Sequence, residues 1–171
     1  MKIRAERDGD LNFIREIKLK SLAAGEEGDL AKRIRRSEFF LPSLSLVAVM
    51  NGRPAGHILF SIISIAQQGR VFPALSLACL AVLPEYQGRG IGGTLIRKGL
   101  KESACAGYGA VIVIGSPGYY SRFGFKPAGN FGLDTGWVTP WETFMAIELE
   151  ENFLGTAGGT VIYPSLFDRA V

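Results

Sequence analysis

Cysteine and histidine are scarce in this sequence, which has two cysteines, Cys79 and Cys105, and one histidine, His57, among 171 residues. Two cysteines cannot form the disulfide framework of a small secreted protein, so both are expected to be small buried apolar side chains. One histidine and two widely separated cysteines also do not make a metal-binding cluster. The sequence therefore predicts a protein of a reducing compartment without a metal site.

Long apolar runs and a strong charge imbalance are also lacking. No run approaches the roughly 20 apolar residues of a membrane span, and the N-terminal MKIRAERDGD has no apolar signal segment. The net charge of +3 suits an anionic ligand but is too small to indicate nucleic-acid binding. With 47% hydrophobic and 20% charged residues, we expect one cytoplasmic domain over residues 1–171, with neither a membrane nor a nucleic acid as partner.

Hydrophobic periodicity predicts two helices near the N-terminus and mostly strands after them. The segment 71–82 is apolar on both faces, with Leu75, Leu77 and Cys79 expected on one face and Leu80 and Val82 on the other, which indicates a central strand. A helix and the strand AVIVI follow it, as in a right-handed crossover, so the class is α/β with a mixed sheet. The expected elements are a strand at 2–4, a helix from Asp8 or Asp10 to Ala24 closed by Gly25, a helix at 29–40 ended by Pro42, a hairpin of 46–50 and 55–65 turning at Asn51-Gly52, a polar turn at 67–70, the strand 71–82, a helix at 91–106, a strand at 110–114, a short helix at 117–123, an edge strand at 125–127 and a strand at 144–149.

The second predicted helix carries a basic run, RIRR, from Arg33 to Arg36. A nucleic-acid patch is one interpretation, and it predicts binding that weakens as salt is added. We favour a solvated helix face, because Asp29 is at pairing distance from Arg33 on a helix.

The stretch LAVLPEYQGRGIGG, from Leu80 to Gly93, carries the strongest functional signal. Pro84 cannot donate a hydrogen bond to a sheet, so it frees the chain from the strand. Four glycines, at 88, 90, 92 and 93, then precede a helix. Unpaired N–H groups and the peptide dipole make a helix N-terminus attractive to anions, and glycines let an anion approach closely. The stretch therefore predicts a diphosphate-binding turn; glycines that serve only helix–strand packing are the alternative.

Two well-known glycine turns do not fit this stretch. The nucleotide-hydrolase loop requires Gly-Lys-Ser/Thr, whereas here Gly92-Gly93-Thr94 contains no lysine. The dinucleotide-binding turn follows the first strand of its fold, whereas this one lies in the middle of the chain.

A third pattern does fit. The spacing Gln87-x-x-Gly90-x-Gly92 after an apolar strand resembles the acetyl-CoA loop of the GNAT superfamily of N-acetyltransferases. YYSRFGF, from Tyr119 to Phe125, resembles the later Tyr-x-x-x-Gly-Phe motif of that superfamily, and the hairpin LVAVMNGRPAGHILF resembles its second and third strands. The resemblance spans nearly the whole chain. The segments SLVAV, GHILF, YYSRFGF and GTVIYP are most similar to the YhbS-like bacterial proteins of the superfamily.

The resemblance implies a central mixed, mostly antiparallel sheet with a splayed parallel strand pair and flanking helices. It also implies an enzyme, with acetyl-CoA as co-substrate and no metal, that transfers the acetyl group to a primary amine of a small molecule or protein by direct attack in a ternary complex. The strand backbone would pair with the pantetheine arm and the glycine turn would hold the pyrophosphate, while the side chain of Ile91 packs under the helix. The implied cofactor-binding residues are Leu80, Ala81, Val82, Gln87, Gly88, Arg89, Gly90, Ile91, Gly92, Gly93, Ser116, Tyr120 and Phe123.

Tyr120 occupies the tyrosine position of the family motif and is the implied catalytic residue. A phenol can protonate a departing thiolate because their ordinary pKa values, about 10 and 8.5, are comparable. The neighbouring Tyr119 is expected in the core or in the cofactor wall. Histone-type members carry a glutamate base on the fourth strand, where this chain has Ser76. Ser76 itself, Glu85, His57 and a water relay therefore stay open as the base, although a histidine in an apolar strand is more often structural.

The acceptor is expected to lie against the first two helices and the loop 128–143, which carries Phe131, Trp137 and Trp141. These aromatic residues form either an acceptor wall or a cover over the core. A non-catalytic acyl-CoA-binding sensor is the alternative function. The segment TVIYP, 160–164, either extends the sheet or pairs with a second copy, and the second arrangement would make a homodimer.

Overall fold

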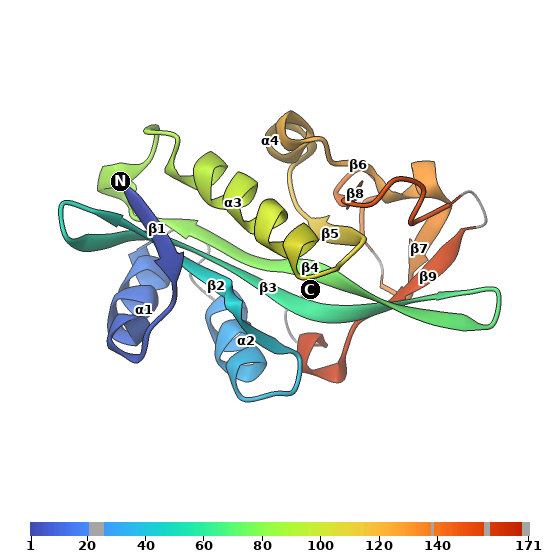
Figure 1. Ribbon diagram of the computed structural model, residues 1–171, viewed down its shortest axis with the longest axis horizontal. Helices are drawn as coiled ribbons and strands as arrows, with labels where there is room; N and C mark the ends of the chain where they lie inside the picture. Colours follow the sequence, from blue (N-terminus) through green and yellow to red (C-terminus); the bar gives the residue numbers. More distant parts are fainter. Residues whose placement is uncertain (21–25, 138, 156–157, 169–171) are drawn as a thin grey trace.

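A sheet of nine strands organises the computed structural model, which describes residues 1–20, 26–137, 139–155 and 158–168 (Figure 1). The strands follow the order β1-β2-β3-β4-β5-β8-β6, and β9 pairs with both β3 and β7. The elements are β1 (Lys2–Ala5), α1 (Leu11–Lys20), α2 (Glu26–Arg35), β2 (Phe40–Met50), β3 (Arg53–Gln67), β4 (Arg70–Val82), α3 (Ile91–Cys105), β5 (Ala110–Ile114), α4 (Pro117–Tyr120), β6 (Lys126–Pro127), β7 (Leu133–Thr135), β8 (Phe144–Glu148) and β9 (Gly159–Ile162). Short 3-10 helices include η1 (Asp8–Asp10), η2 (Pro84–Tyr86), η3 (Ser121–Phe123), η4 (Ala128–Phe131) and η5 (Ser165–Phe167).

Helices cover both faces of the sheet. In Figure 1, α3 lies on one face, and α1 and α2 lie on the other. Leu95 and Ile96 of α3 are fully buried in one apolar cluster with Phe60 of β3. Ile34 of α2 is buried in a second cluster with Leu59 of the same strand. Central strands covered on two sides must be apolar on two sides, as the sequence of β4 predicts.

The strands β4 and β5 form a parallel pair that soon separates. Their register contains two pairs, Leu75 with Val111 and Ser76 with Ile112. From Leu77 to Val82, β4 stays paired with β3 but no longer with β5. All other pairs in the sheet are antiparallel, except the pair of β7 with β9. The predicted mixed, mostly antiparallel sheet with a splayed parallel pair is confirmed.

The hairpin turn predicted at Asn51-Gly52 is confirmed, and its backbone shows why these residues stand there. Asn51 and Gly52 have φ angles of 49° and 79°, as a two-residue turn of the primed type requires. Gln68 and Gly69 repeat this conformation between β3 and β4, at 49° and 74°.

The expected faces of β4 are wrong in one respect. Leu59 pairs with Cys79 and the next residue, Phe60, pairs with Leu77, so Ala78 is an extra residue in β4. This bulge reverses the alternation: Cys79 packs in the cluster on the α2 side, whereas Leu77 and Leu80 both face the α3 side. A strict period of two cannot reveal such an insertion.

The predicted end of the second helix is also wrong. α2 ends at Arg35, where the Ser37 hydroxyl donates to the Ile34 carbonyl at 2.8 Å, and β2 already begins at Phe40. Pro42 therefore lies inside a strand, in the irregular stretch between the pairs Phe40–Ser61 and Ser45–Leu59. A proline is tolerated there because the irregular pairing demands no N–H from it.

Two further predictions concern the first helix and the segment near the C-terminus. α1 begins after η1, and Asp10 there accepts a hydrogen bond from the Arg7 amide at 2.8 Å; its predicted end at Ala24 and Gly25 lies outside the described residues. Near the C-terminus, Thr160, Val161 and Ile162 pair with residues 64–66 of β3, so this segment extends the sheet.

Candidate functional site

The turn between β4 and α3 is built by glycines of two kinds. Gly88 and Gly90 adopt left-handed φ angles of 73° and 77°, which side chains rarely allow. Gly92 lies inside the first turn of α3, and a Cβ atom on it would be 2.5 Å from the Tyr119 hydroxyl oxygen. Gly88 and Gly90 therefore give the turn its shape, and the missing side chain of Gly92 leaves room for the Tyr119 hydroxyl at the start of α3. The first N–H groups of α3 have no partner within the helix, so they form an anion-attracting end.

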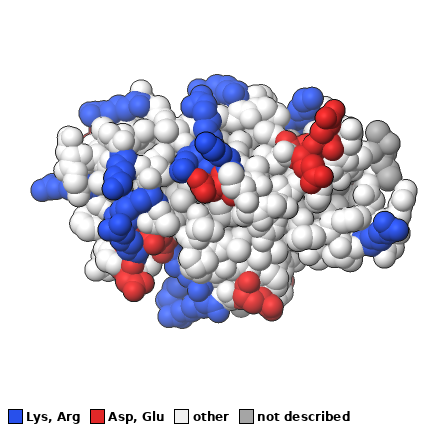
Figure 2. All heavy atoms as spheres, viewed as in Figure 1, with Lys and Arg blue, Asp and Glu red and all other residues white. Residues whose placement is uncertain are grey.

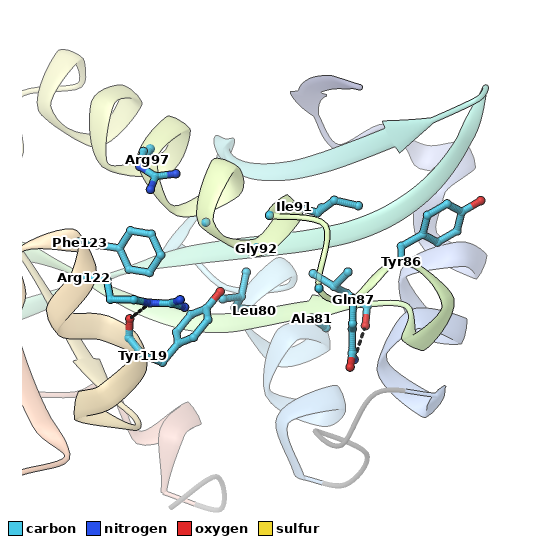
Figure 3. A pocket seen from close by; sticks show the side chains of 14 residues that line it. Leu80, Ala81, Tyr86, Gln87, Ile91, Gly92, Arg97, Tyr119, Arg122 and Phe123 are labelled. Atoms are coloured by element: carbon cyan, nitrogen blue, oxygen red, sulfur yellow. Dashed lines mark hydrogen bonds between the residues drawn. The ribbon is translucent and has the colours of Figure 1, made fainter.

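A cleft of about 590 Å³ lies between this turn and the open edge of β4 (Figure 3). Its β4 wall is the part of the strand that has separated from β5. The side chain of Gln87 folds back and donates to the Val82 carbonyl at 3.0 Å, which links the turn to the strand end. The residues that line the cleft are Leu80, Ala81, Val82, Tyr86, Gln87, Gly88, Gly90, Ile91, Gly92, Gly93, Arg97, Tyr119, Arg122 and Phe123.

The structure brings ten of the thirteen sequence-predicted cofactor residues to this cleft and leaves three outside its lining. Arg89 is exposed, with its guanidinium 5.5 Å from the centre of the Tyr86 ring. Ser116 is exposed at the start of α4, where its carbonyl accepts hydrogen bonds from the amides of Tyr119 and Tyr120 at 3.0 Å. Tyr120 is the third.

The two adjacent tyrosines point to different places. Tyr119 lines the cleft with its hydroxyl over Gly92, as a residue of the cofactor wall would. Burial raises the pKa of the Tyr119 phenol, and the charges of Arg122 and Arg97 oppose that shift. The half-buried ring of Tyr120 packs against Gly115, just after β5, and edge-on against Phe125 at 5.7 Å.

The sequence predictions miss three cleft residues, Tyr86, Arg97 and Arg122. Arg97 follows Gly93 by four residues, a spacing that puts both on one side of a helix. That spacing is a signal from which Arg97 could be predicted. Arg122 lies within YYSRFGF, but a sequence motif does not tell which way its arginine points.

Two candidates for the base lie in different surroundings. Glu85 is exposed on η2, outside the cleft lining. Ser76 is 4% exposed, on the side of the sheet that carries Tyr163. Burial raises the pKa of the Tyr163 phenol, and Ser76 opposes the shift.

The third candidate, His57, is fully buried in a cluster of charged and polar groups. Its Nε2 atom is 3.1 Å from the Glu6 carboxylate and 3.0 Å from the Ser45 hydroxyl. Arg35 of α2 grips the same carboxylate with two hydrogen bonds, at 2.6 and 2.8 Å. Burial, the largest effect, raises the pKa of Glu6, but hydrogen bonds from His57, Arg35 and Ser45 together hold that pKa well below its usual range. These contacts support a structural role for His57.

The basic run of α2 is neither a free patch nor a solvated face. Arg35 binds Glu6, and Arg33 donates to the Leu166 carbonyl at 2.8 Å, so both join α2 to other parts of the chain; Arg36 is exposed. The side chain of Asp29, the predicted partner of Arg33, lies outside the described residues. Figure 2 shows Lys and Arg spread over the visible face, without a single dense patch.

The aromatic residues of the segment 128–143 divide between the two interpretations. Trp137 stacks on Tyr163, with ring centroids 4.0 Å apart. Phe131 and Trp137 both pack against the apolar cluster on the α2 side of the sheet. These two cover the core. Trp141 is 66% exposed and is the one that a further molecule could reach.

Metal-binding groups of three or more His, Cys, Asp or Glu side chains do not occur in the part of the chain that the structure describes. Among the same residues, no helix combines the length and the apolar character needed to cross a membrane.

A family model supports a relationship to acetyltransferases. Residues 17–128 match the model described as "Acetyltransferase (GNAT) domain". Among curated proteins, the chain is 39% identical over 136 residues to the uncharacterized N-acetyltransferase YjhQ of Escherichia coli, covering 78% of this chain and 74% of YjhQ. It is 32% identical over 170 residues to the uncharacterized N-acetyltransferase YhbS of the same species, covering 99% of both.

Solved structures give the same picture. The crystal structure of E. coli YhbS in complex with CoA matches with a TM-score of 0.89 at 31% identity, over 98% of this chain and 92% of that one. A GNAT family acetyltransferase from Brucella melitensis, in complex with acetyl-CoA, matches with a TM-score of 0.76 at 31% identity, over 98% and 97%.

Proposed function

The chain belongs to the GNAT family of acetyltransferases, and from this premise we propose that it transfers the acetyl group of acetyl-CoA to a primary amine of a small molecule or protein, by direct attack in a ternary complex. The observation that carries the proposal is the cleft, where the unpaired edge of β4 meets the glycine turn at the start of α3.

Acetyl-CoA has two parts that suit the two walls of this cleft. The pyrophosphate is an anion, and the N–H groups around Gly90 and Gly92 are its partners in the proposal. The pantetheine arm contains amide groups, and the backbone of residues 80–82 offers them an open strand edge. The CoA and acetyl-CoA complexes of the two similar structures support this assignment.

The proposed chemistry needs one acid and one route for a proton. The neutral amine attacks the thioester carbonyl, a C–N bond forms, the C–S bond breaks, and the thiolate of CoA takes up a proton. Tyr120 is the proposed donor, because it packs beside Gly115 where β5 ends, on the strand that separates from β4. The Tyr120 phenolate then takes up the proton that the amine nitrogen loses.

Water carries that amine proton in the proposal, rather than a carboxylate. His57 is fully buried among Glu6, Ser45 and Arg35, and Glu85 is exposed outside the cleft lining. Ser76 stands where histone-type relatives have glutamate, and its hydroxyl is not basic.

A non-catalytic acyl-CoA sensor is the second candidate, and the serine at position 76 favours it. Such a sensor would bind acetyl-CoA in the same cleft and leave the thioester intact. The two candidates therefore differ in turnover and not in binding.

The test combines the protein with acetyl-CoA and a metabolite extract, and mass spectrometry finds species that gain an acetyl group. Heat-inactivated protein gives the background. We expect Tyr120→Phe to lower turnover by about 100-fold while acetyl-CoA binding stays unchanged, because general-acid catalysis contributes about that much. Tyr108→Phe, which removes a half-buried hydroxyl outside the cleft lining, is the control and should keep most of the turnover.

Full turnover by Tyr120→Phe would remove the tyrosine from the mechanism. Tight acetyl-CoA binding without any product, from small amines and from protein amines alike, would favour the sensor.

A further inference from the structure

Two arginines enter the cleft from different elements, Arg97 from α3 and Arg122 from η3 (Figure 3). Both guanidinium groups lie over the ring of Phe123, at 5.3 and 5.5 Å from its centre, and that of Arg122 also lies 4.5 Å from the centre of the Tyr119 ring. The Nε atom of Arg122 donates to the Tyr119 carbonyl at 3.2 Å. Both side chains are exposed to solvent, and the aromatic rings hold their guanidinium groups beside the cleft.

The charge of these two arginines is not balanced by nearby acids. Arg4, Arg35 and Lys98 each form an ion pair with a carboxylate. Within the described residues no such pair involves Arg97 or Arg122, and the fourteen cleft residues include neither Asp nor Glu. The cleft therefore attracts anions at two places, the glycine turn and the arginine pair.

The distance between the two places is about one helical turn. Arg97 follows Gly93 by four residues, which corresponds to about 6 Å along α3. A ligand that uses both places must carry two anionic groups with a short linker between them. In CoA a single ribose joins the diphosphate to the 3′-phosphate.

We propose that Arg97 and Arg122 bind the ribose 3′-phosphate of CoA and make the cleft selective for CoA over 3′-dephospho-CoA. This inference rests on the proposed function, because it takes the diphosphate to lie at the glycine turn. Guanidinium groups bind phosphate oxygens with two parallel hydrogen bonds, and Phe123 keeps both groups at the cleft before the ligand arrives.

The test is calorimetric titration of the full chain with CoA and with 3′-dephospho-CoA at low salt. We expect CoA to bind at least about tenfold more tightly, and the ratio to shrink as salt is added, because exposed charges are screened. The double variant Arg97→Met and Arg122→Met keeps apolar stems over Phe123 and should bring the ratio close to one, mainly by weakening CoA binding. The double variant Lys98→Met and Lys101→Met removes the same charge from α3 outside the cleft lining and should keep the wild-type ratio.

Equal affinity of the wild-type chain for the two ligands overturns the inference and leaves the proposed function in place. Loss of the ratio in both double variants also overturns it, because net charge and not the arginine pair would then be responsible. Failure of the wild-type chain to bind either ligand overturns the proposed function, and this inference with it.

Discussion

The glycines of the turn have different structural roles, although they are the same residue type. Gly88 and Gly90 have left-handed backbones and open space where a Cβ atom would be, so only conformation requires glycine there. Gly92 and Gly93 lie within the helix and face Tyr119 and Phe123, so a Cβ atom there would crowd the aromatic side chains. A substitution therefore acts through backbone strain at the first pair and through displaced aromatic rings at the second.

The Gly90→Ala variant tests the role of conformation. A φ of 77° strains an alanine, so we expect the free energy of unfolding to fall by about 1 kcal/mol and acetyl-CoA binding to weaken as the turn shifts. Chemical denaturation and calorimetry measure the two effects. Gly129→Ala is the control and should change neither quantity appreciably, because Gly129 has the same open space around a Cβ atom but no left-handed φ. A Gly90→Ala variant that binds normally would show that the turn tolerates another shape.

The sequence indicates which residues reach the cleft where spacing determines position, and it does not do so where side-chain direction matters. Gln87, Gly90 and Gly92 reach the cleft because a strand, a turn and a helix follow each other directly. Tyr119 and Tyr120 cannot be assigned in that way, because neighbours on a short helix point apart and only packing on Gly115 shows where Tyr120 goes.

At the scale of elements, one buried ionic cluster fastens α2 to the sheet. Glu6 follows β1, Ser45 belongs to β2 and His57 to β3, and Arg35 is the last residue of α2. The Ser45 hydroxyl donates to the Glu6 carboxylate, which thus receives hydrogen bonds from three elements. Removing one partner of such a cluster leaves the others buried without compensation.

Stability should depend on pH through this carboxylate. The folded-state pKa of Glu6 is lowered, so its contribution is fully present above the ordinary value of 4.5 and is lost as pH falls below it. We expect Glu6→Gln to lower the free energy of unfolding at pH 7 by about 3 kcal/mol and to flatten its decline below pH 4.5.

Urea denaturation between pH 3 and 7 measures both quantities, with the exposed Glu85→Gln as control. A Glu6→Gln variant as stable as the wild-type chain at pH 7 would contradict the role given to the cluster.

Element boundaries are harder to predict from the sequence than element types. The helices and the central strands follow from periodicity. Pro42 leads to a wrong helix end, because a proline within a helical pattern usually ends the helix, whereas here the irregular pairing of β2 accommodates it inside a strand. The bulge at Ala78 is also hard to predict, because the extra residue is visible only in how β4 pairs with β3. β7 and β9 are short, and more than twenty residues of chain separate them, so no local sequence pattern predicts that they pair.

For the whole molecule, the separation of β4 from β5 is the feature that opens the cleft in which we propose that acetyl-CoA binds. The two strands share two register pairs, so the edge of β4 beyond Ser76 lies open beside the α3 turn. The family resemblance predicts this arrangement, whereas composition and charge only limit the class of protein. Helices cover both faces of the sheet (Figure 1). The cleft lies where β4 separates from β5, beside the turn that begins α3 (Figure 3).

Hydrogen exchange of the backbone amides, measured by mass spectrometry with and without acetyl-CoA, tests most directly whether this cleft holds the cofactor. We expect added protection in two segments, residues 80–82 and residues 87–93, because both offer backbone groups to acetyl-CoA in the proposed complex. Peptides from the hairpin turn at 51–52 should exchange equally in both samples. Protection confined to other segments, with residues 80–93 unchanged by saturating acetyl-CoA, would show that the cofactor does not bind in this cleft.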